Sequence, residues 1–333
     1  MMEFKGFSSI ENSYRAAYLE TLRNQSLTDG LFVVQEKVHG ANFSFHLSEG
    51  VMRTAKRTSF IDDPKDFYPC DALVEALAPR IRDLAGQVQG KEVAVFGELC
   101  GGFYNHADVT PVKNLSPVQR GVCYAPDLQF YAFDVRVDGA YLPVSEANRL
   151  FEAVGLFYAR TLFSGSLEAC LAYPNDFQSL VPQWLGLPPI ETNMCEGTII
   201  RPEEPRHQPS GSRVILKNKN DCWKERNKKT PVVESLVAIS PQAEHLIGEL
   251  QALVNENRLA NVLSKMGPVT AKDFGRIIGA LSRDVMEEFN KDHEQAFADL
   301  VKHEQKQAKK RLSTALTSLV KSRIEDAAAG LWP

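Results

Sequence analysis

The stretch 31-LFVVQEKVHGAN-42 combines an apolar run, a lysine at its end and a glycine three residues after that lysine. A short apolar run that ends in turn residues predicts a buried β-strand over about residues 31–38. Lys37 therefore lies at a strand end, where its amine is a nucleophile once it has lost a proton. Gly40 permits a tight turn or a close backbone approach. Alone, the pattern also fits an ordinary surface lysine.

The flanking sequence up to about residue 230 predicts an α+β unit with a mainly antiparallel sheet. Short apolar runs alternate there with turn residues, as is typical of strands of about four to eight residues. The runs are LFVVQEKV (31–38), NFSFHL (42–47), VAVFGELC (93–100), QFYAFDVRV (129–137), GTIIRP (197–202) and RVILKNK (213–219). Helices are expected over 70–85, interrupted by Pro79, and over 145–154, with Ser145 as N-cap and Gly155 as the stop.

The last hundred residues predict a small all-α domain. Ser240-Pro241 is an N-cap followed by proline at the first helical position. Thr270 with Asp273 resembles a capping box. A helical stripe of apolar residues follows, made of Phe297, Leu300, Val301, Leu312, Leu316, Leu319 and Ile324. We therefore expect two domains, 1–232 and 233–333.

Composition excludes several classes of protein. The chain has 333 residues, 44% of them hydrophobic and 24% charged, which argues against wholesale disorder, collagen and coiled-coil rods. No apolar run approaches the ~18–20 residues of a membrane span, and the N-terminus lacks the apolar core of a secretory signal. The six cysteines form no CxxC zinc framework, so reduced thiols are expected. These features predict a cytoplasmic protein without a membrane partner, in the host cytoplasm if the source is viral.

Charge is distributed unevenly along the chain. The formal net charge is −4, so any surface for nucleic acid must be local. Residues 206–229 contain eight Lys or Arg against two acidic residues, together with Trp223. Such a segment suits a phosphate-rich ligand with an aromatic ring for stacking, although a solvated face beside a domain boundary has the same composition.

Six short motifs follow one another along the first 220 residues. They are KVHGAN (37–42), AKR (55–57), FGE (96–98), FYAFD (130–134), EGTIIRP (196–202) and KNK (217–219). Their order resembles that of the covalent nucleotidyltransferases, and their forms most closely resemble the RNA ligase 2 family, which includes phage RNA ligases and trypanosome RNA-editing ligases. The resemblance spans about residues 7–230 and continues weakly through 258–281. It implies an ATP-grasp-like nucleotidyltransferase fold followed by a helical domain that engages RNA.

The resemblance implies a three-step reaction with ATP and Mg²⁺, Mn²⁺ being an alternative. Lys37 attacks the α-phosphorus of ATP and becomes lysyl-AMP, AMP passes to an RNA 5′-phosphate, and a 3′-OH then displaces AMP. Lys217 and Lys219 lie two apart and project from one strand face. There they would stabilise phosphate charge and help to lower the pKa of Lys37. Glu196 resembles the metal-binding carboxylate of the family, since Mg²⁺ prefers oxygen ligands.

The remaining motif residues take roles by the same resemblance. Glu98 is expected to bind the ribose, and an acid inside an apolar run is costly without a partner. Phe133 would stack on adenine, Asp134 would serve the second half-reaction, and His39 would be catalytic. The nucleotide-binding set is completed by Glu36, Val38, Asn42 and Arg57. The RNA-binding set is Lys56, Arg57, Gln119 and Arg201.

The resemblance also has departures and competitors. Gln35, Arg201 and Phe7 stand where relatives have an arginine, a lysine and a tyrosine, which affects the expected RNA preferences but not the covalent chemistry. DNA ligases and capping guanylyltransferases usually carry aspartate where His39 stands, and they usually append an OB-fold. A catalytically silent RNA-binding relative is a third reading. The expected partner is RNA with 3′-OH and 5′-phosphate ends, as a nicked or otherwise duplex substrate, bound by a monomer.

Overall fold

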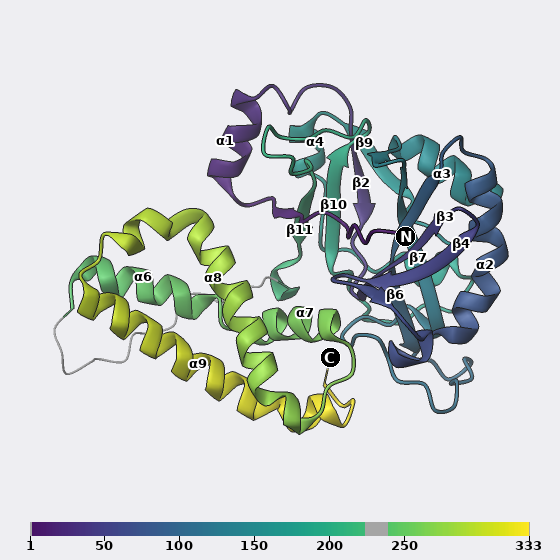
Figure 1. Ribbon diagram of the computed structural model, residues 1–333. Coiled ribbons are helices and arrows are strands. Elements are labelled where there is room, and N and C mark those ends of the chain that lie inside the picture. The colour runs from purple at the N-terminus through teal and green to yellow at the C-terminus, as the bar shows by residue number, and fades with distance from the viewer. Residues whose placement is uncertain (1, 224–238, 333) are drawn as a thin grey trace. The chain divides into compact units, whose positions relative to one another are not determined.

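The computed structural model describes residues 2–223 and 239–332, which form two compact units, Met1–Cys222 and Trp223–Pro333. The predicted boundary between residues 232 and 233 lies outside the described residues. The predicted α+β class, with antiparallel sheets and a helical C-terminal region, is confirmed (Figure 1).

The first unit contains two sheets (Figure 1). The five-stranded sheet has the order β1-β11-β10-β2-β9, and the six-stranded sheet has the order β5-β4-β3-β6-β7-β8. Neighbouring strands are antiparallel except β1 and β11, which are parallel. The strands of the first sheet are β1 (Glu11–Asn12), β2 (Phe32–Glu36), β9 (Thr161–Gly165), β10 (Gly197–Pro202) and β11 (Leu216–Lys219). Those of the second are β3 (Ala41–Ser48), β4 (Val51–Lys56), β5 (Phe60–Ile61), β6 (Glu92–Phe103), β7 (Ala125–Val137) and β8 (Ala140–Tyr141).

Each sheet buries one face against helices. The helices of this unit are α1 (Ala16–Asn24), α2 (Asp71–Gly86), α3 (Val144–Ala153), α4 (Leu167–Leu171) and α5 (Val181–Trp184). Phe32 and Val34 of β2 pack in one core with Leu22 of α1 and Leu167 of α4. The larger core packs the second sheet against α2 and α3, as shown by its members Phe43, Phe45, Ile81, Leu84, Leu150 and Phe151.

Strand alternation sends the polar residues to the opposite faces of both sheets. In β2, β10 and β11 the residues that follow the buried Val34, Ile200 and Leu216 are polar or charged and point to the opposite face, because successive side chains of a strand alternate. That face carries Gln35, Ile199, Arg201, Lys217 and Lys219. The corresponding face of β3 and β6 carries Asn42, which pairs in register with Glu98. The fold thus places Arg201, Lys217, Lys219 and Asn42 on the sheet faces opposite the helix-packed cores.

Helix boundaries confirm some of the predicted caps and correct others. Ser240 accepts a hydrogen bond from Ala243 N, with Pro241 at the first position of α6 (Pro241–Ala252). The predicted N-cap Ser145 is wrong: α3 begins at Val144 after Pro143, and the amide of Ser145 donates to Glu203 Oε1. Glu203 caps the helix from outside instead, since its carbonyl accepts from Val144 N and its carboxylate from Ser145 N.

The second unit is a helical bundle. Its other helices are α7 (Glu256–Met266), α8 (Phe274–Ala298) and α9 (Lys302–Ala328). Thr270 and Asp273 do form the predicted capping box, but at the 3₁₀ turn Ala271–Asp273 that precedes α8. Val301, predicted in the apolar stripe, is 55% exposed because it is the N-cap residue of α9. Leu312, Leu316 and Ile324 are buried as expected.

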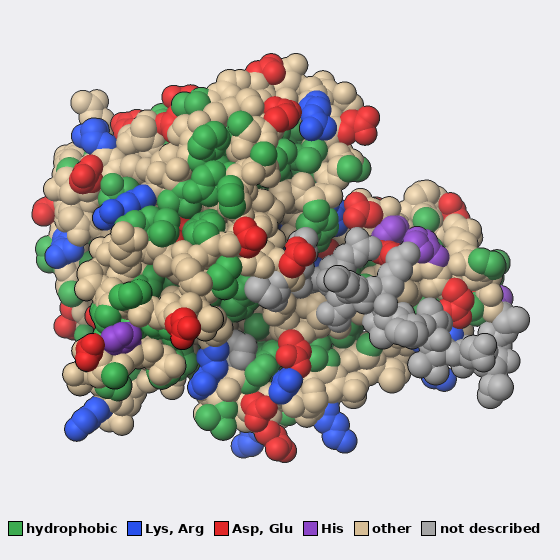
Figure 2. All heavy atoms as spheres, turned by 180° about the vertical axis from the view of Figure 1, so that it is seen from behind, with side chains coloured by type: hydrophobic (Ala, Val, Ile, Leu, Met, Phe, Trp, Pro, Cys, Tyr) green, Lys and Arg blue, Asp and Glu red, His purple; other side chains and the backbone are tan. Residues whose placement is uncertain are grey.

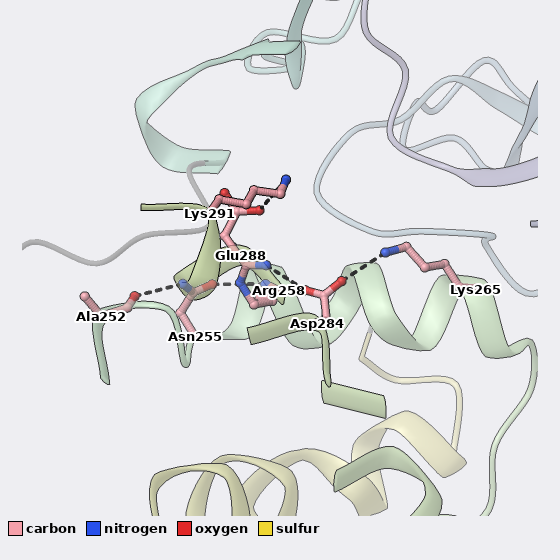
Figure 3. A network of polar contacts seen from close by, with 7 residues as sticks. All are labelled: Ala252, Asn255, Arg258, Lys265, Asp284, Glu288 and Lys291. Carbon is pink, nitrogen blue, oxygen red and sulfur yellow. Dashed lines mark hydrogen bonds and ion pairs between the residues drawn. The ribbon is translucent and has the colours of Figure 1, made fainter. Parts of the chain in front are cut away.

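A polar network ties α7 to α8 inside this unit (Figure 3). Arg258 is 2% exposed and donates from Nη1 to Asp284 Oδ2 at 2.6 Å. Asn255 caps α7 by accepting from Arg258 N, and Lys265 contacts the other oxygen of Asp284 at 3.2 Å. A buried guanidinium needs such a counter-ion, so the network fixes how the two helices pack.

Three further observations concern the helices, the cysteines and the surface. Among the described helices, none combines the length and the apolar character needed to cross a membrane. The described cysteines are free thiols, as predicted. Seen from behind, hydrophobic side chains gather on the face of the first unit, with acidic and basic side chains scattered around them (Figure 2).

Candidate active site

Lys37 follows the last residue of β2 and is fixed by the neighbouring strand. Its amide donates to Gly197 O at 2.9 Å, which continues the β2–β10 pairing by one residue. Gly197 has φ of 140°, and a Cβ there would lie 2.2 Å from Asn218 O. Only glycine is compatible with this backbone, so the glycine after Glu196 keeps β10 close to β11 and positions the carboxylate.

Glu196 is the centre of the charged cluster around Lys37. Its carboxylate is fully buried and contacts Lys37 Nζ at 2.5 Å and Lys219 Nζ at 2.8 Å, with His39 Nδ1 at 3.7 Å. Burial alone would raise the pKa of Glu196, but Lys219, Lys37 and His39 outweigh it and lower the pKa to about 2. The group is therefore ionised at any physiological pH. The structure thus unites four residues from three motifs, KVHGAN, EGTIIRP and KNK.

This arrangement differs from the expectation for the lysine pair. Lys217 and Lys219 do lie on one face of β11, opposite Ile199 and Gly197 of β10. However, Lys219 is buried and paired with Glu196, while Lys217 is only half-buried. A carboxylate thus stands between Lys37 and the nearer of the two cations.

Gly40 brings the site segment against β6. A Cβ at Gly40 would lie 2.2 Å from Leu99 O and 2.8 Å from Glu98 Cγ. Burial raises the pKa of the adjacent Glu98 to about 7, with Glu196 acting in the same direction and with Lys37, Arg57 and a hydrogen bond from Gly40 opposing it. Glu98 therefore lies within electrostatic range of Lys37 and Arg57.

Glu36 points away from the charged cluster. It is 1% exposed, and its carboxylate accepts from Ser179 Oγ at 2.6 Å and from Leu180 N at 2.9 Å. Burial raises its pKa to about 7 in spite of these two hydrogen bonds. The strand that carries the lysine is thereby tied to the loop before α5.

Phe133 and Asp134 occupy an irregular point of the second sheet. Phe96 pairs with Asp134 and Gly97 with Ala132, so Phe133 is an extra residue in β7, a β-bulge. Its ring meets that of Phe7 at 4.9 Å between centroids. The bulge redirects the following side chain, a role that bulges often have near functional sites.

Asp134 is buried in an ion cluster of its own. It is fully buried and accepts from Arg201 Nη1 at 2.8 Å and Arg213 Nη1 at 2.6 Å. Arg201 also donates to Phe133 O at 2.7 Å. The structure therefore joins β7 to β10 here rather than placing Asp134 in contact with Lys37 or Glu196.

The other predicted residues are distributed around these two clusters. Val38 is buried, and the amide of His39 donates to Tyr124 Oη at 2.8 Å. Lys56 ends β4 and Arg57 follows it, both half-buried. Gln119 lies in the long β6–β7 connection; it is 5% exposed, and neither side-chain amide atom has a hydrogen-bond partner among the described residues.

Sequence reasoning missed several supporting residues. Ser179 and Tyr124 lie in segments without a motif, so nothing in their local sequence indicated them. Arg213 and Arg206 belong to the basic segment 206–229, interpreted above as a phosphate surface. The structure corrects this for both: Arg213 is buried against Asp134, and Arg206 donates to the carbonyls of Leu27 and Asp29. Residues 224–229 of that segment lie outside the described residues.

Comparisons with known proteins agree with the sequence resemblance. A family model described as RNA ligase matches residues 30–219, and one described as T4 RNA ligase 2 C-terminal matches residues 237–318. The mitochondrial RNA-editing ligase 2 of Trypanosoma brucei brucei is 29% identical over 89% of this chain and 85% of its own length. The mitochondrial RNA-editing ligase 1 is 28% identical over 82% of this chain and 73% of its own.

Solved structures include an RNA ligase of Naegleria gruberi with PPi, at 14% identity and a TM-score of 0.44 over 67% of this chain and 58% of that one. The first family model covers more than half of the sequence. The chain therefore belongs to the RNA ligase family. It is a ligase that joins RNA ends.

Proposed function

We propose that this ligase works through a covalent Lys37–AMP intermediate and joins a 3′-OH to a 5′-phosphate. The proposal is carried by one observation, the strand-end amine of Lys37 held at 2.5 Å from the buried carboxylate of Glu196. A lysine fixed by its own backbone pairing and by an ionised partner is pre-oriented, which removes much of the entropic cost of attack.

In the first step, Lys37 Nζ gives up a proton to solvent and forms a bond to the α-phosphorus of ATP. The bond between that phosphorus and the bridging oxygen breaks, and pyrophosphate leaves with the electron pair. The amine must part from Glu196 to attack. Lys219 then remains beside Glu196, and half-buried Lys217, on the same face of β11, is assigned to the departing phosphates. This division of labour between the two lysines supports charge stabilisation in the transition state.

The second and third steps transfer AMP to the RNA and then release it. The 5′-phosphate oxygen attacks the phosphorus of Lys37–AMP, the P–N bond breaks, and the amine is regenerated. The RNA 3′-OH then attacks the activated 5′-phosphate, and AMP leaves. We assign Lys56, Arg57 and Gln119 to the RNA, since two are half-buried cations and the third is a buried amide with unfilled hydrogen-bonding capacity.

The residues present fit a magnesium ion held jointly with ATP. Among the described residues, no group of three or more His, Cys, Asp or Glu is arranged to hold a metal. Mg²⁺ nevertheless commonly takes one or two carboxylates and completes its shell with phosphates and water. Glu196 is ionised, with a pKa of about 2, and supplies that carboxylate once Lys37 has moved. The ion, or Mn²⁺ in its place, would neutralise phosphate charge.

The nucleotide itself is assigned to the faces around Glu98 and Phe133. Asn42 and Glu98 are register partners on adjacent strands and offer hydrogen bonds to a ribose. Phe133 is half-buried at the bulge and offers a ring for adenine, and we assign to the nucleotide also Glu36 and Val38, which flank Lys37. Asp134 and Arg201 act behind this ring as positioning residues, since Arg201 binds Phe133 O at 2.7 Å.

The finer identity of the substrate is also part of the proposal. We assign a nicked duplex RNA, a monomeric enzyme, and a cytoplasmic site of action, although the two trypanosome relatives are named as mitochondrial. The unit Met1–Cys222 would carry the nucleotide chemistry, and the helical unit would engage RNA.

The proposal is tested by intact mass after incubation with Mg²⁺ and each nucleoside triphosphate in turn. Wild type should gain one AMP from ATP and none of the other nucleotides, and Lys37→Ala should gain nothing. Lys91→Ala, which removes an exposed lysine, is the matched control and should behave as wild type. A GMP adduct would instead indicate that the protein is a guanylyltransferase. An unmodified, folded wild type that was not already adenylylated would refute the covalent intermediate.

A further inference from the structure

The first turns of α9 expose a row of lysines on one face. Lys302, Lys306, Lys309 and Lys310 are all exposed, and Glu304 and Ala308 between them are buried. At 3.6 residues per turn, the four lysines fall within about 100° of arc opposite the buried stripe. From Lys302 to Lys310 the row is about 12 Å long, at 1.5 Å per residue. We call these four residues the α9 lysine row.

The row differs from Arg311, Arg323 and Glu304 of the same helix, each of which has a polar contact within the described residues. Arg311 pairs with Glu244, Arg323 pairs with Glu256, and Glu304 accepts from the amide of Ser240. Within the described part of the chain, none of the four lysines forms an ion pair or a side-chain hydrogen bond. Arg311 and Arg323 thus hold the bundle together, whereas the row is directed to solvent.

The row is also locally unfavourable for the helix. Lys302 is the first residue of α9, where the helix dipole disfavours a cation. Lys302 with Lys306, and Lys306 with Lys310, are like charges at spacing i, i+4, which weakens a helix. Residues 239–332 contain thirteen acidic and thirteen basic residues, so overall composition does not force lysines to gather here. Local rules broken without a structural gain typically mark a functional surface.

We propose that the α9 lysine row binds the phosphate backbone of the RNA substrate. Lysine is a point-charge binder of phosphate, and a line of exposed ammoniums suits a repeating polyanion whose sequence need not be read. This inference rests on the proposed function and adds to it a named surface in the helical unit, apart from the residues assigned to nucleotide chemistry.

The test compares two triple variants of the full chain. Lys302→Gln, Lys306→Gln and Lys309→Gln remove three charges from the row. The control removes three charges from exposed residues elsewhere in the same unit, by Lys272→Gln, Arg283→Gln and Lys321→Gln. Binding of a fluorescein-labelled nicked RNA duplex is measured by anisotropy in EDTA over a salt series, so that no chemistry occurs. The same proteins are scored for Lys37–AMP formation with ATP and Mg²⁺, and for thermal stability.

The row variant should bind about tenfold more weakly at low salt, with the slope of log K against log salt reduced by about 2–3. Its Lys37–AMP yield should equal that of wild type, and its Tm should be unchanged or raised, because like-charge repulsion has been removed. The control should keep the wild-type slope.

Three outcomes would overturn the proposal. The row variant could bind RNA as tightly as the control does, or both variants could lose RNA affinity equally. The wild type could also bind polyglutamate as strongly as RNA. A wild type that forms no Lys37–AMP would refute the proposed function instead. In that case, the difference in RNA binding between the row variant and the control would still show whether the row binds RNA.

Discussion

Gly40 is set against the second sheet so closely that no side chain fits. The change Gly40→Ala places a Cβ 2.2 Å from Leu99 O and 2.8 Å from Glu98 Cγ, so the backbone between Lys37 and β3 must move. We expect a loss of about 1–3 kcal/mol in stability and at least tenfold slower Lys37–AMP formation. Mass spectrometry over a time course measures the rate, and urea unfolding measures the stability.

The control for this substitution is Gly86→Ala at the last residue of α2. Nothing lies within 4 Å of a Cβ at that position, and alanine favours helix more than glycine does. Gly86→Ala should keep full activity and be at least as stable as wild type. A Gly40→Ala enzyme with the wild-type rate would show that the close approach is not needed for chemistry.

Glu36 predicts a pH dependence of stability. Burial raises its pKa to about 7 from an ordinary 4.5, so the folded chain holds this proton more tightly than the unfolded chain. Its contribution is complete below about pH 4.5 and is lost as pH rises through 7. Gln keeps the shape without the ionisation, so Glu36→Gln should be stabilised relative to wild type at pH 8 by on the order of 2 kcal/mol, and little at pH 5. Thermal melts at both values measure the difference.

The comparison between these two pH values isolates Glu36, because Glu98 and His46 titrate equally in both proteins. A constant difference in Tm between wild type and Glu36→Gln would contradict the prediction. Lost Lys37–AMP formation in this stable variant would assign the carboxylate itself to ATP.

At the residue scale, the sequence indicated which residues come together, but it did not indicate which of them touch one another. Lys37, His39, Glu196 and Lys219 were grouped in advance, because short motifs at strand ends preserve residue type and order. The carboxylate between the two lysines was not foreseen, since it depends on how β10 is registered against β2 and β11. Ser179 and Arg213 were missed because their contacts cross 143 and 79 positions of chain.

At the element scale, strands with strong apolar runs were predicted well and short ones were not. Each of the six runs contains a strand, whereas β1, with two residues, and β9, with an exposed pattern, have too little hydrophobic signal. The bulge at Phe133 was also invisible, because an extra residue in a strand is defined by its partner. The caps at Ser240 and Thr270 were predicted because a cap depends on local chemistry.

The α7–α8 network gives a prediction at this scale (Figure 3). Asp284→Ala removes the counter-ion of Arg258, which is 2% exposed, and should destabilise the helical unit by about 2–3 kcal/mol. Lys265→Ala breaks the outer contact of the same carboxylate, where the lysine is 43% exposed, and should cost less than about 1 kcal/mol. Hydrogen exchange of the α7 and α8 amides measures both. Equal protection in the two variants would contradict the ranking.

For the whole molecule, the two units should divide the reaction. Every residue assigned to ATP lies within Met1–Cys222, which has its own cores. A chain ending at residue 222 should therefore form Lys37–AMP within about threefold of the full-length rate, and lose at least tenfold in joining RNA ends if the helical unit adds phosphate contacts. Mass spectrometry and gel-resolved ligation compare the two proteins. A truncated chain that folds but takes no AMP would show that the helical unit is needed for the first step.

The parallel pairing of β1 with β11 also has a consequence for synthesis. Residues 11 and 12 pair with residues 216 and 217, so β1 cannot form its pairing until β11 has been synthesised. At roughly 5–20 residues per second, that delay lasts about 10–40 s on the ribosome. Lys37 likewise meets Glu196 and Lys219 only when those strands emerge. A nascent chain would therefore contain Lys37 but would not react with ATP until the first unit has been synthesised and has folded.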